Sequence, residues 1–415
     1  MSYELIRANA LNLPLADNSV DLCITSPPYF ALRAYQDQGE VYDGQIGSEA
    51  TPQAFLEALW AWTAECVRVL KPSGSLWVNL GDKMSRGDRT TVDGTTDKRR
   101  QGDSRVPPCR DIPAKSLMGL PWRYAIGCID QLGLILRAEV IWSKPNGLPE
   151  SVTDRVRRSH EQWFHFTKEP RYFSAVDEIR EPHEDTFHAG RRGAGQEAWQ
   201  DGPKGDVHGQ NRTDAWGVRL YNPLGKLPGS VWTVPTEPLR VPDHLGVDHF
   251  AAFPSEFPRR IILGWSPSGV CVACGEGRRP VVDVDRSDVN PARTLAVMDG
   301  YAAGTGRTNH GTGGSTLANE ADKVRRTITG YACACPDTTA PTRPAVILDP
   351  FTGTGTVPAV AHALGRHGIG IDLSADYLRL AEWRCNDPKL RAKVLGVDAP
   401  KPPVEGQMTM FGGAA

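Results

Sequence analysis

The chain has 415 residues, a formal net charge of −2 and 40% hydrophobic residues, and this length fits one large domain with insertions or two domains. The sequence contains no apolar run long enough to span a membrane and no segment typical of a signal peptide, so we expect a cytoplasmic protein. A net charge near zero does not exclude nucleic acid as a partner, because a local basic face is sufficient to bind phosphates.

Two strands are predicted at the start of the chain, and the second ends abruptly. Apolar residues indicate a strand that begins at Tyr3 and a buried strand over Val20–Ile24. Pro27 and Pro28 cannot continue a central strand, so the chain must turn outward just after Ile24. The residues of this turn are therefore expected at the carboxyl end of a strand, the edge at which open α/β sheets bind ligands.

The turn, Thr25-Ser26-Pro27-Pro28-Tyr29, combines a hydroxyl, a proline carbonyl and an aromatic ring. These groups suit the binding of a planar ring that carries an exocyclic amine. Tyr29 can stack on the ring, while Ser26 and the carbonyl of Pro27 can accept its two N–H bonds. We therefore take Ser26, Pro27, Pro28 and Tyr29 as candidate catalytic residues; the alternative for Tyr29 is a core tyrosine that closes the turn.

The middle of the chain alternates regular elements with polar stretches. Helical spacing of apolar residues predicts helices over Pro52–Leu70 and Leu120–Leu132, and strands are expected over Leu136–Trp142 and Gln162–Phe166. Residues 84–115 are rich in Gly, Asp and Arg, which is typical of a solvated, mobile loop. A loop that becomes ordered on phosphates is the alternative, because Lys98-Arg99-Arg100 lies at its centre.

Residues 181–228 lose periodicity and form a candidate target-recognition insertion. An ordinary surface insertion is an equally good interpretation. The residues that could contact phosphates and bases are Arg191, Arg192, Lys204, Asn211, Arg212 and Trp216.

Four of the nine cysteines form two tight pairs that bracket a second insertion, residues 268–342. Cys271 and Cys274 are flanked by glycines, as in a zinc knuckle, and Cys333 and Cys335 are separated by one residue. Four thiolates in two pairs suit a tetrahedral zinc ion, and a chance cluster of free thiols is the alternative. Zinc would fix the base of this insertion while its basic residues face nucleic acid.

A glycine-rich turn, Asp349-Pro350-Phe351-Thr352-Gly353-Thr354-Gly355-Thr356, connects a predicted strand, Val346–Leu348, with a predicted helix, Val357–Leu364. This layout lets the backbone approach a nucleotide-like ligand closely. The following strand, Gly368–Asp372, ends in an acid that can accept hydrogen bonds from ribose hydroxyls. Because the turn contains no Lys, a ligand with a sugar but no phosphate fits best, and S-adenosylmethionine is such a ligand.

These motifs in this order resemble the amino-methyltransferases of DNA, in the permuted arrangement called the beta group, where the proline-tyrosine motif precedes the glycine motif. The resemblance implies an α/β fold with the Rossmann-like sheet of S-adenosylmethionine-dependent methyltransferases. The sheet would be circularly permuted, so that the C-terminal strands join the N-terminal ones, and interrupted by polar insertions, one of them a small zinc-binding module.

Further segments match the family. Leu5–Ala10 lies where the family has a strand that ends near the cofactor adenine, with Asn9 in place of an acid, and His249–Pro254 resembles the segment that closes over the methionine part. Ile141–Asn146 and Arg158–Glu161 resemble later motifs, and Glu161 belongs to a strand that borders the base pocket. The candidate cofactor-binding residues are Asn9, Phe253, Pro254, Asp349, Pro350, Phe351, Gly353, Gly355, Thr356 and Asp372.

The resemblance implies methyl transfer from S-adenosylmethionine to an amine of a base flipped out of double-stranded DNA, as in restriction-modification systems. Within the family, Ser-Pro-Pro-Tyr preceded by Thr is commoner in enzymes that methylate N4 of cytosine, and adenine N6 is the alternative. A non-catalytic DNA-binding protein that keeps the fold is an alternative from another class. Pro108-Cys109 matches the nucleophile of cytosine C5 enzymes only as a dipeptide, because it lies in a polar stretch and precedes the glycine motif.

The predicted organisation has a core in three pieces and a tail. Its core segments are 1–180, 229–267 and 343–396, separated by the insertions 181–228 and 268–342 and followed by a flexible tail, 397–415. Gln407–Phe411 in this tail resembles the peptides by which bacterial proteins bind the sliding clamp, and a frayed terminus is the alternative.

Overall fold

A computed structural model describes residues 3–31, 36–37, 40–41, 45–85, 111–147, 149–182, 224–239, 241–242, 245–246, 252–285, 325–337 and 339–399. The chain divides into two compact units, the first formed by Met1–Ser174, Gly229–Gly277 and Thr339–Ala415 and the second by Ala175–Pro228 and Arg278–Thr338. Several predictions concern residues outside the described ranges: most of the polar loop with Cys109, the basic residues of the recognition insertion, and Gln407–Phe411.

The first unit is built on an eight-stranded sheet with the order β1-β14-β13-β2-β5-β7-β6-β8. Its strands are β1 (Tyr3–Arg7), β2 (Val20–Thr25), β5 (Leu70–Leu80), β6 (Ile135–Ser143), β7 (His160–Thr167), β8 (Val231–Thr233), β13 (Val346–Asp349) and β14 (His367–Asp372). All neighbours are parallel except β7, which runs antiparallel to both β5 and β6. A mainly parallel sheet of this kind requires cover on both faces.

The C-terminal strands β13 and β14 lie between β1 and β2. Tyr3 pairs with Gly368, and Ile347 pairs with Leu22, so strands from the two ends of the sequence are neighbours in one sheet. The prediction of a permuted α/β sheet is therefore confirmed. All six residues of β2 are buried, as expected for a strand with both faces covered.

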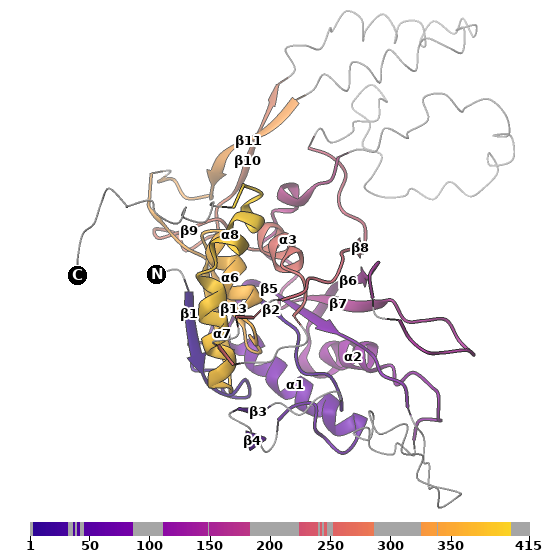
Figure 1. Ribbon diagram of the computed structural model, residues 1–415. Helices are drawn as coiled ribbons and strands as arrows, with labels where there is room; N and C mark the ends of the chain where they lie inside the picture. Colours follow the sequence, from indigo (N-terminus) through magenta and orange to yellow (C-terminus); the bar gives the residue numbers. More distant parts are fainter. Residues whose placement is uncertain are drawn as a thin grey trace, which may run out of the picture. The chain divides into compact units, whose positions relative to one another are not determined.

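Helices cover both faces of the sheet. On one face lie α1 (Pro52–Val69) and α2 (Leu120–Leu132), whose apolar residues share a core with β2 and β5. The other face is covered by α3 (Glu256–Trp265), α6 (Thr356–Ala363) and α8 (Pro388–Leu395), while α7 (Ala375–Cys385) contacts β1 and β14. In Figure 1, α6, α7 and α8 form a yellow group beside β1 and β13, away from the purple pair of α1 and α2.

Local sequence explains where α1 starts. The hydroxyl of Thr51 accepts a hydrogen bond from the backbone N–H of Ala54, and Pro52 occupies the first turn, where a missing N–H costs nothing. Phe55, Leu59 and Trp62 then recur at helical spacing and are buried.

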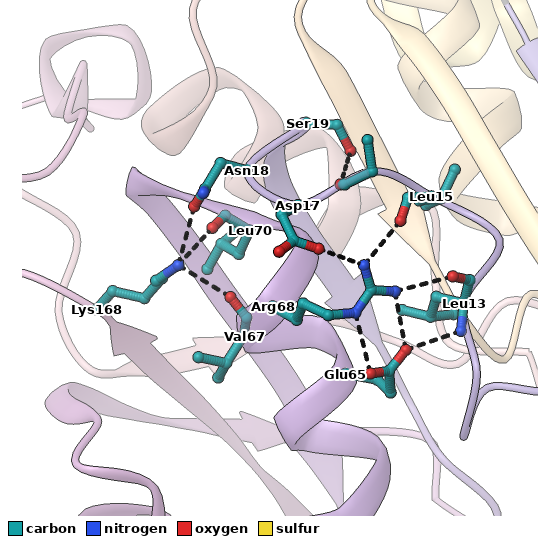
Figure 2. A network of polar contacts seen from close by, with 11 residues as sticks. Leu13, Leu15, Asp17, Asn18, Ser19, Glu65, Val67, Arg68, Leu70 and Lys168 are labelled. Atoms are coloured by element: carbon teal, nitrogen blue, oxygen red, sulfur yellow. Dashed lines mark hydrogen bonds and ion pairs between the residues drawn. The ribbon is translucent and has the colours of Figure 1, made fainter.

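A polar network fixes the loop between β1 and β2 against the end of α1 (Figure 2). The guanidinium of Arg68 donates to the carbonyls of Leu13 and Leu15, at 2.9 Å each, and pairs with Asp17 and Glu65. Lys168 donates to the carbonyls at the end of α1, which have no partner within the helix. The network orders the long connection between β1 and β2 at the edge where β2 and β5 begin. The residues at the carboxyl edge of the sheet take no part in it.

Short strand pairs complete both units. In the first unit β3 (Gln36–Asp37) pairs with β4 (Glu40–Val41), and β9 (Val270–Cys271) pairs with β12 (Thr342–Arg343). In the second unit β10 (Arg279–Asp285) and β11 (Arg325–Ala332) form an antiparallel ladder, and a short helix, η2 (Val176–Ile179), precedes a bridge between Glu181 and Lys226. The described helices include none that is long and apolar enough to cross a membrane.

Candidate active site

The sheet gathers the sequence motifs at one edge. Strands β1, β14, β13, β2 and β5 are parallel, so their carboxyl ends meet there. The antiparallel strand β7 begins at the same edge, because Gln162 pairs with Leu80, the last residue of β5. Topology therefore brings Ser26, Asp349 and Asp372 from three separate segments to a common edge.

Ser26 and Tyr29 meet at the side chain of Asn79, near the end of β5. The Ser26 hydroxyl lies 3.3 Å from Asn79 Oδ1, and the Tyr29 hydroxyl lies 2.9 Å from the same oxygen. The Asn79 amide is oriented by a 3.1 Å bond from its Nδ2 to the carbonyl of Gln162, which leaves Oδ1 directed to the two hydroxyls. The candidate catalytic loop thus rests on a buried amide that the sequence analysis assigned no role.

Glu161, at the start of β7, also contacts Tyr29. Its Oε2 lies 3.0 Å from the Tyr29 hydroxyl, and its Oε1 accepts a hydrogen bond from Lys144. Lys144 in turn lies over the ring of Trp142, with Nζ 4.0 Å from the ring centroid. Glu161, which the resemblance places on a strand that borders the base pocket, thus contacts the tyrosine of the motif.

Two glycines let the Tyr29 segment pack closely. A Cβ at Gly81 would lie 2.7 Å from Cε2 of the Tyr29 ring, and a Cβ at Gly47 would lie 2.9 Å from the Tyr29 carbonyl oxygen. Gly47 has φ +96°, a conformation that other residues rarely adopt. The tyrosine is therefore confined at its ring, its hydroxyl and its backbone.

Asp349 links the glycine-rich turn to the catalytic strand. It is 1% exposed, and its Oδ1 accepts bonds from the Thr25 hydroxyl at 2.7 Å and from the backbone N–H of Phe351 at 3.1 Å. Burial raises the pKa of Asp349 to about 7, and the two hydrogen bonds oppose this rise. The nearby charge of Asp372 adds to it.

The carboxylate of Asp372 holds the backbone of the turn around Gly353 and Gly355. Asp372 accepts bonds from the N–H of Gly353 and of Ser374, each at 2.9 Å. Gly355 has φ +74°, and a Cβ there would lie 2.6 Å from Cβ of Ala381 in α7. Only glycine fits this close approach between turn and helix, which explains the residue at this position.

A buried arginine supports the same turn from α7. Arg384 is 4% exposed, and its Nη1 donates to the hydroxyls of Thr354 and Thr356 at 2.6 Å each. Burial lowers the pKa of Arg384, while the charge of Glu237 opposes that shift. The side chain of Thr356, a candidate cofactor residue, is thus directed into the protein, where its hydroxyl accepts a hydrogen bond from Arg384.

The other candidate cofactor residues lie around this edge with different exposure. Asn9 is exposed and its side chain accepts a bond from the N–H of Leu11 at 2.9 Å. Pro350 is buried, and Phe351 contacts the ring of Trp62 edge to face at 5.2 Å. Phe253 packs edge to face on Trp163 at 5.3 Å, and Pro254 is buried at the start of α3.

The four cysteines of the expected zinc site belong to different units, Cys271 and Cys274 to the first and Cys333 and Cys335 to the second. Cys271 is buried in β9, and the carbonyl of Cys271 accepts a bond from the N–H of Gly275 at 2.9 Å, which closes a knuckle-like turn around Cys274. In the second unit, Cys333 and Cys335 follow directly after β11.

Three functional contacts escaped the sequence analysis: those of Asn79, Lys144 and Arg384. Asn79 carried a usable signal, since it is a polar residue inside the apolar run Leu76–Leu80, next to the carboxyl end of a strand. Arg384 had no comparable signal, because a basic residue near the end of a helix is ordinarily solvent-exposed.

The chain is similar to known DNA methylases in sequence and in fold. A family model described as DNA methylase, for the N6 and N4 enzymes, matches residues 20–273 and 340–382. The chain is 42% identical over 160 residues to the type II methyltransferase M.XycI of Xanthomonas campestris pv. cyanopsidis, a match that covers 38% of this chain and 51% of that protein.

Two further relatives align over more of the sequence. Identity is 32% with M.Cfr9I of Citrobacter freundii, over 61% of this chain and 69% of that protein, and 28% with M.SmaI of Serratia marcescens, over 88% and 83%. Among solved structures, PvuII DNA methyltransferase, described as cytosine-N4-specific, is similar with a TM-score of 0.50 at 13% identity, over 96% of this chain and 94% of that one. That likeness concerns the fold.

Proposed function

Because the chain belongs to the family of N6 and N4 DNA methylases, we propose that it transfers a methyl group from S-adenosylmethionine to N4 of cytosine in double-stranded DNA. The type II methyltransferases among its relatives support a role in a restriction-modification system. The observation that carries the choice of an amine as acceptor is the contact between Ser26 and Asn79 at the carboxyl edge of β2 and β5.

Asn79 determines what the Ser26 hydroxyl can do. A hydroxyl has one proton to donate and two lone pairs that accept, so its role depends on where the proton points. With Asn79 Oδ1 at 3.3 Å as acceptor, the lone pairs of Ser26 Oγ are available to an N–H group. The Tyr29 hydroxyl also lies 2.9 Å from Asn79 Oδ1, but its single proton can go to the charged carboxylate of Glu161 at 3.0 Å, which leaves Asn79 Oδ1 to accept from Ser26.

The base amine is a weak nucleophile because its lone pair is delocalised into the ring. Ser26 Oγ and the carbonyl of Pro27 would hold its two N–H groups, so that the nitrogen lone pair lies out of the ring plane. Flipping the base out of the duplex costs a modest unstacking energy. Tyr29 would then stack on the flipped base in place of the bases that flanked it in the duplex. S-adenosylmethionine would supply an electrophilic methyl group; in one in-line displacement the C–N bond would form as the S–C bond breaks, with S-adenosylhomocysteine as the leaving group and the amine proton passing to water.

The glycine-rich turn fits such a cofactor. Gly353, with φ +46°, turns the backbone after Asp349, and the carboxylate oxygens of Asp372 can each accept a second bond, as ribose hydroxyls require. The buried hydroxyl of Thr352 has no hydrogen-bond partner among the described residues, so this polar atom of the turn can bond to a ligand. Asn9, Phe253, Pro254, Asp349, Pro350, Phe351 and Thr356 complete the proposed cofactor site.

Adenine N6 is the second candidate acceptor, since both amines present two N–H groups to the same pair of oxygens. Thr25-Ser26-Pro27-Pro28-Tyr29 favours cytosine. A non-catalytic DNA-binding protein would have no use for both an intact base-binding loop and an intact glycine turn, so catalysis is the better proposal.

We also propose that Cys271, Cys274, Cys333 and Cys335 bind one structural zinc ion. Each cysteine pair adjoins a strand ladder: Cys271 is paired with Thr342, and Ala332, which precedes Cys333, is paired with Arg279. Four thiolates form a closed tetrahedral set. Metal analysis of the purified protein should give one zinc per chain, and Cys274→Ser should lose it while Cys385→Ala, outside the pairs, keeps it; a metal-free wild type would contradict the assignment.

The proposed reaction is tested by transfer of a labelled methyl group from S-adenosylmethionine to double-stranded DNA of varied sequence. We expect label in DNA, none in RNA, and competition by the demethylated cofactor. A protein that binds both ligands but incorporates no label would favour the non-catalytic alternative.

A further inference from the structure

We propose that Glu161, held by Lys144, is a positioning residue that fixes the ring of Tyr29 for stacking on the target base. This inference rests on the proposed function and adds to it a residue pair from a different part of the sheet. The pair acts through the Tyr29 hydroxyl and has no direct contact with the reacting amine.

The geometry links three segments of the chain. Glu161 is the second residue of β7, where it pairs across the ladder with Trp142 of β6. Lys144 follows β6, and its ammonium contacts both the Glu161 carboxylate and the face of the Trp142 ring. The other carboxylate oxygen lies 3.0 Å from the hydroxyl of Tyr29, so a single side chain joins the ion pair to the catalytic loop.

Burial gives this ion pair a defined geometry. The side chains of Lys144 and Glu161 are 19% and 18% exposed, far less than those of a surface pair such as Lys115 and Asp154 at 82% and 58%. A partly buried pair is less screened by water and salt than an exposed one. The carboxylate therefore offers Tyr29 a charged acceptor in a fixed place, which makes a stronger hydrogen bond than a neutral group.

The stacking role requires such a restraint. A tyrosine in a turn after a strand would otherwise rotate about two side-chain torsions, and ordering it on binding would weaken base capture. Gly81 at the ring and Gly47 at the backbone limit its position, but neither can fix the ring through a directional bond. Glu161, on β7, supplies that direction by accepting the proton of the hydroxyl, and Asn79 Oδ1, on the adjacent strand β5, lies 2.9 Å from the same hydroxyl.

A double-mutant cycle tests the inference. We expect Glu161→Ala and Tyr29→Phe each to lower kcat for methyl transfer by about 10- to 100-fold, as for a small misplacement of a reacting group. The double variant should be no slower than Tyr29→Phe alone, because Glu161 acts through the hydroxyl that Phe lacks. Glu161→Gln keeps an acceptor and should recover part of the rate, while the Kd for S-adenosylmethionine should stay unchanged in all variants.

A second measurement is independent of turnover. With 3-fluorotyrosine at position 29, the wild type should give one sharp ¹⁹F resonance, and Glu161→Ala should give a broadened or divided one. Additive losses in the double variant, or an unchanged resonance in Glu161→Ala, would overturn the positioning role. A wild type that transfers no methyl group would overturn the proposed function instead, and the ¹⁹F spectrum would still decide whether Glu161 orders the ring.

Discussion

The proposed base-binding side of the edge, around Ser26 and Tyr29, and the proposed cofactor-binding side, around Asp349 and the glycine-rich turn, use their side chains in opposite ways; they are called the base side and the cofactor side below. On the base side, Ser26, Tyr29 and Glu161 are partly exposed; Tyr29 contacts Glu161, and the hydroxyls of Ser26 and Tyr29 both reach Asn79 Oδ1. On the cofactor side, Asp349 and Arg384 are at most 4% exposed and bond to the chain around the glycine-rich turn. The base side therefore presents side chains to its ligand, whereas the cofactor side uses side chains to shape a backbone that meets the ligand.

This difference is tested most strongly at Ser26. Ser26→Ala removes the oxygen that accepts the amine N–H, and we expect kcat to fall by about 100- to 1,000-fold, as for loss of one positioned hydrogen-bonding group. The thermal midpoint should hardly move, because Ser26 is partly exposed.

Ser19 provides a matched control, since its hydroxyl bonds only a local carbonyl, that of Ala16. Ser19→Ala should retain the wild-type kcat. Full activity of Ser26→Ala would remove Ser26 from the mechanism.

On the cofactor side, Gly355→Ala should mainly affect binding and stability. Its Cβ would lie 2.6 Å from that of Ala381, so the turn and α7 must separate, which we expect to weaken cofactor binding by about tenfold or more and to lower stability by about 1–3 kcal/mol. Calorimetric titration and denaturant unfolding measure the two effects.

Gly396→Ala isolates the contribution of backbone strain. Gly396 also has positive φ, +67°, but a Cβ there would meet nothing within 4 Å. If Gly355→Ala and Gly396→Ala lost equal stability and both kept cofactor affinity, the close packing of the turn on α7 would contribute neither to stability nor to cofactor binding.

A smaller effect is expected at Arg384. Arg384→Lys keeps the charge but cannot place one rigid guanidinium nitrogen between the hydroxyls of Thr354 and Thr356. We expect a several-fold increase in the cofactor Kd with little change in kcat at saturating cofactor. Arg379→Lys, at a position 53% exposed on the same helix, should leave Kd unchanged, and equal behaviour of the two variants would argue against support of the turn.

The smallest effect on methyl transfer is expected for Asp349→Asn, which should instead change the pH dependence of stability. The folded pKa, about 7, lies above the ordinary value of 3.8, so between these values the folded protein holds a proton that the unfolded chain releases. Stability from this group is present below about pH 4 and is lost as pH rises toward 7. Asparagine can accept the same bonds from Thr25 and Phe351, and urea unfolding at several pH values should show that loss in the wild type and not in the variant.

The sequence predicted the framework of both sides, for reasons visible in particular residues. Pro27 and Pro28 required an exit from the sheet after Ile24, and Gly353 with Gly355 required a tight turn, so both loops could be placed at strand ends. The contacts between them depend on sheet order. Nothing local predicts that Glu161 would face Tyr29 or that Arg384 would be buried under Thr354, because each pair is brought together by long-range packing.

The most direct measurement is mass spectrometry of nucleosides from DNA that the protein has methylated in vitro. We expect N4-methylcytosine, formed by the wild type and strongly reduced with Ser26→Ala. N6-methyladenine in its place would contradict the assignment of cytosine as the base held by Ser26 and Pro27, while the methyltransferase reaction itself would stand.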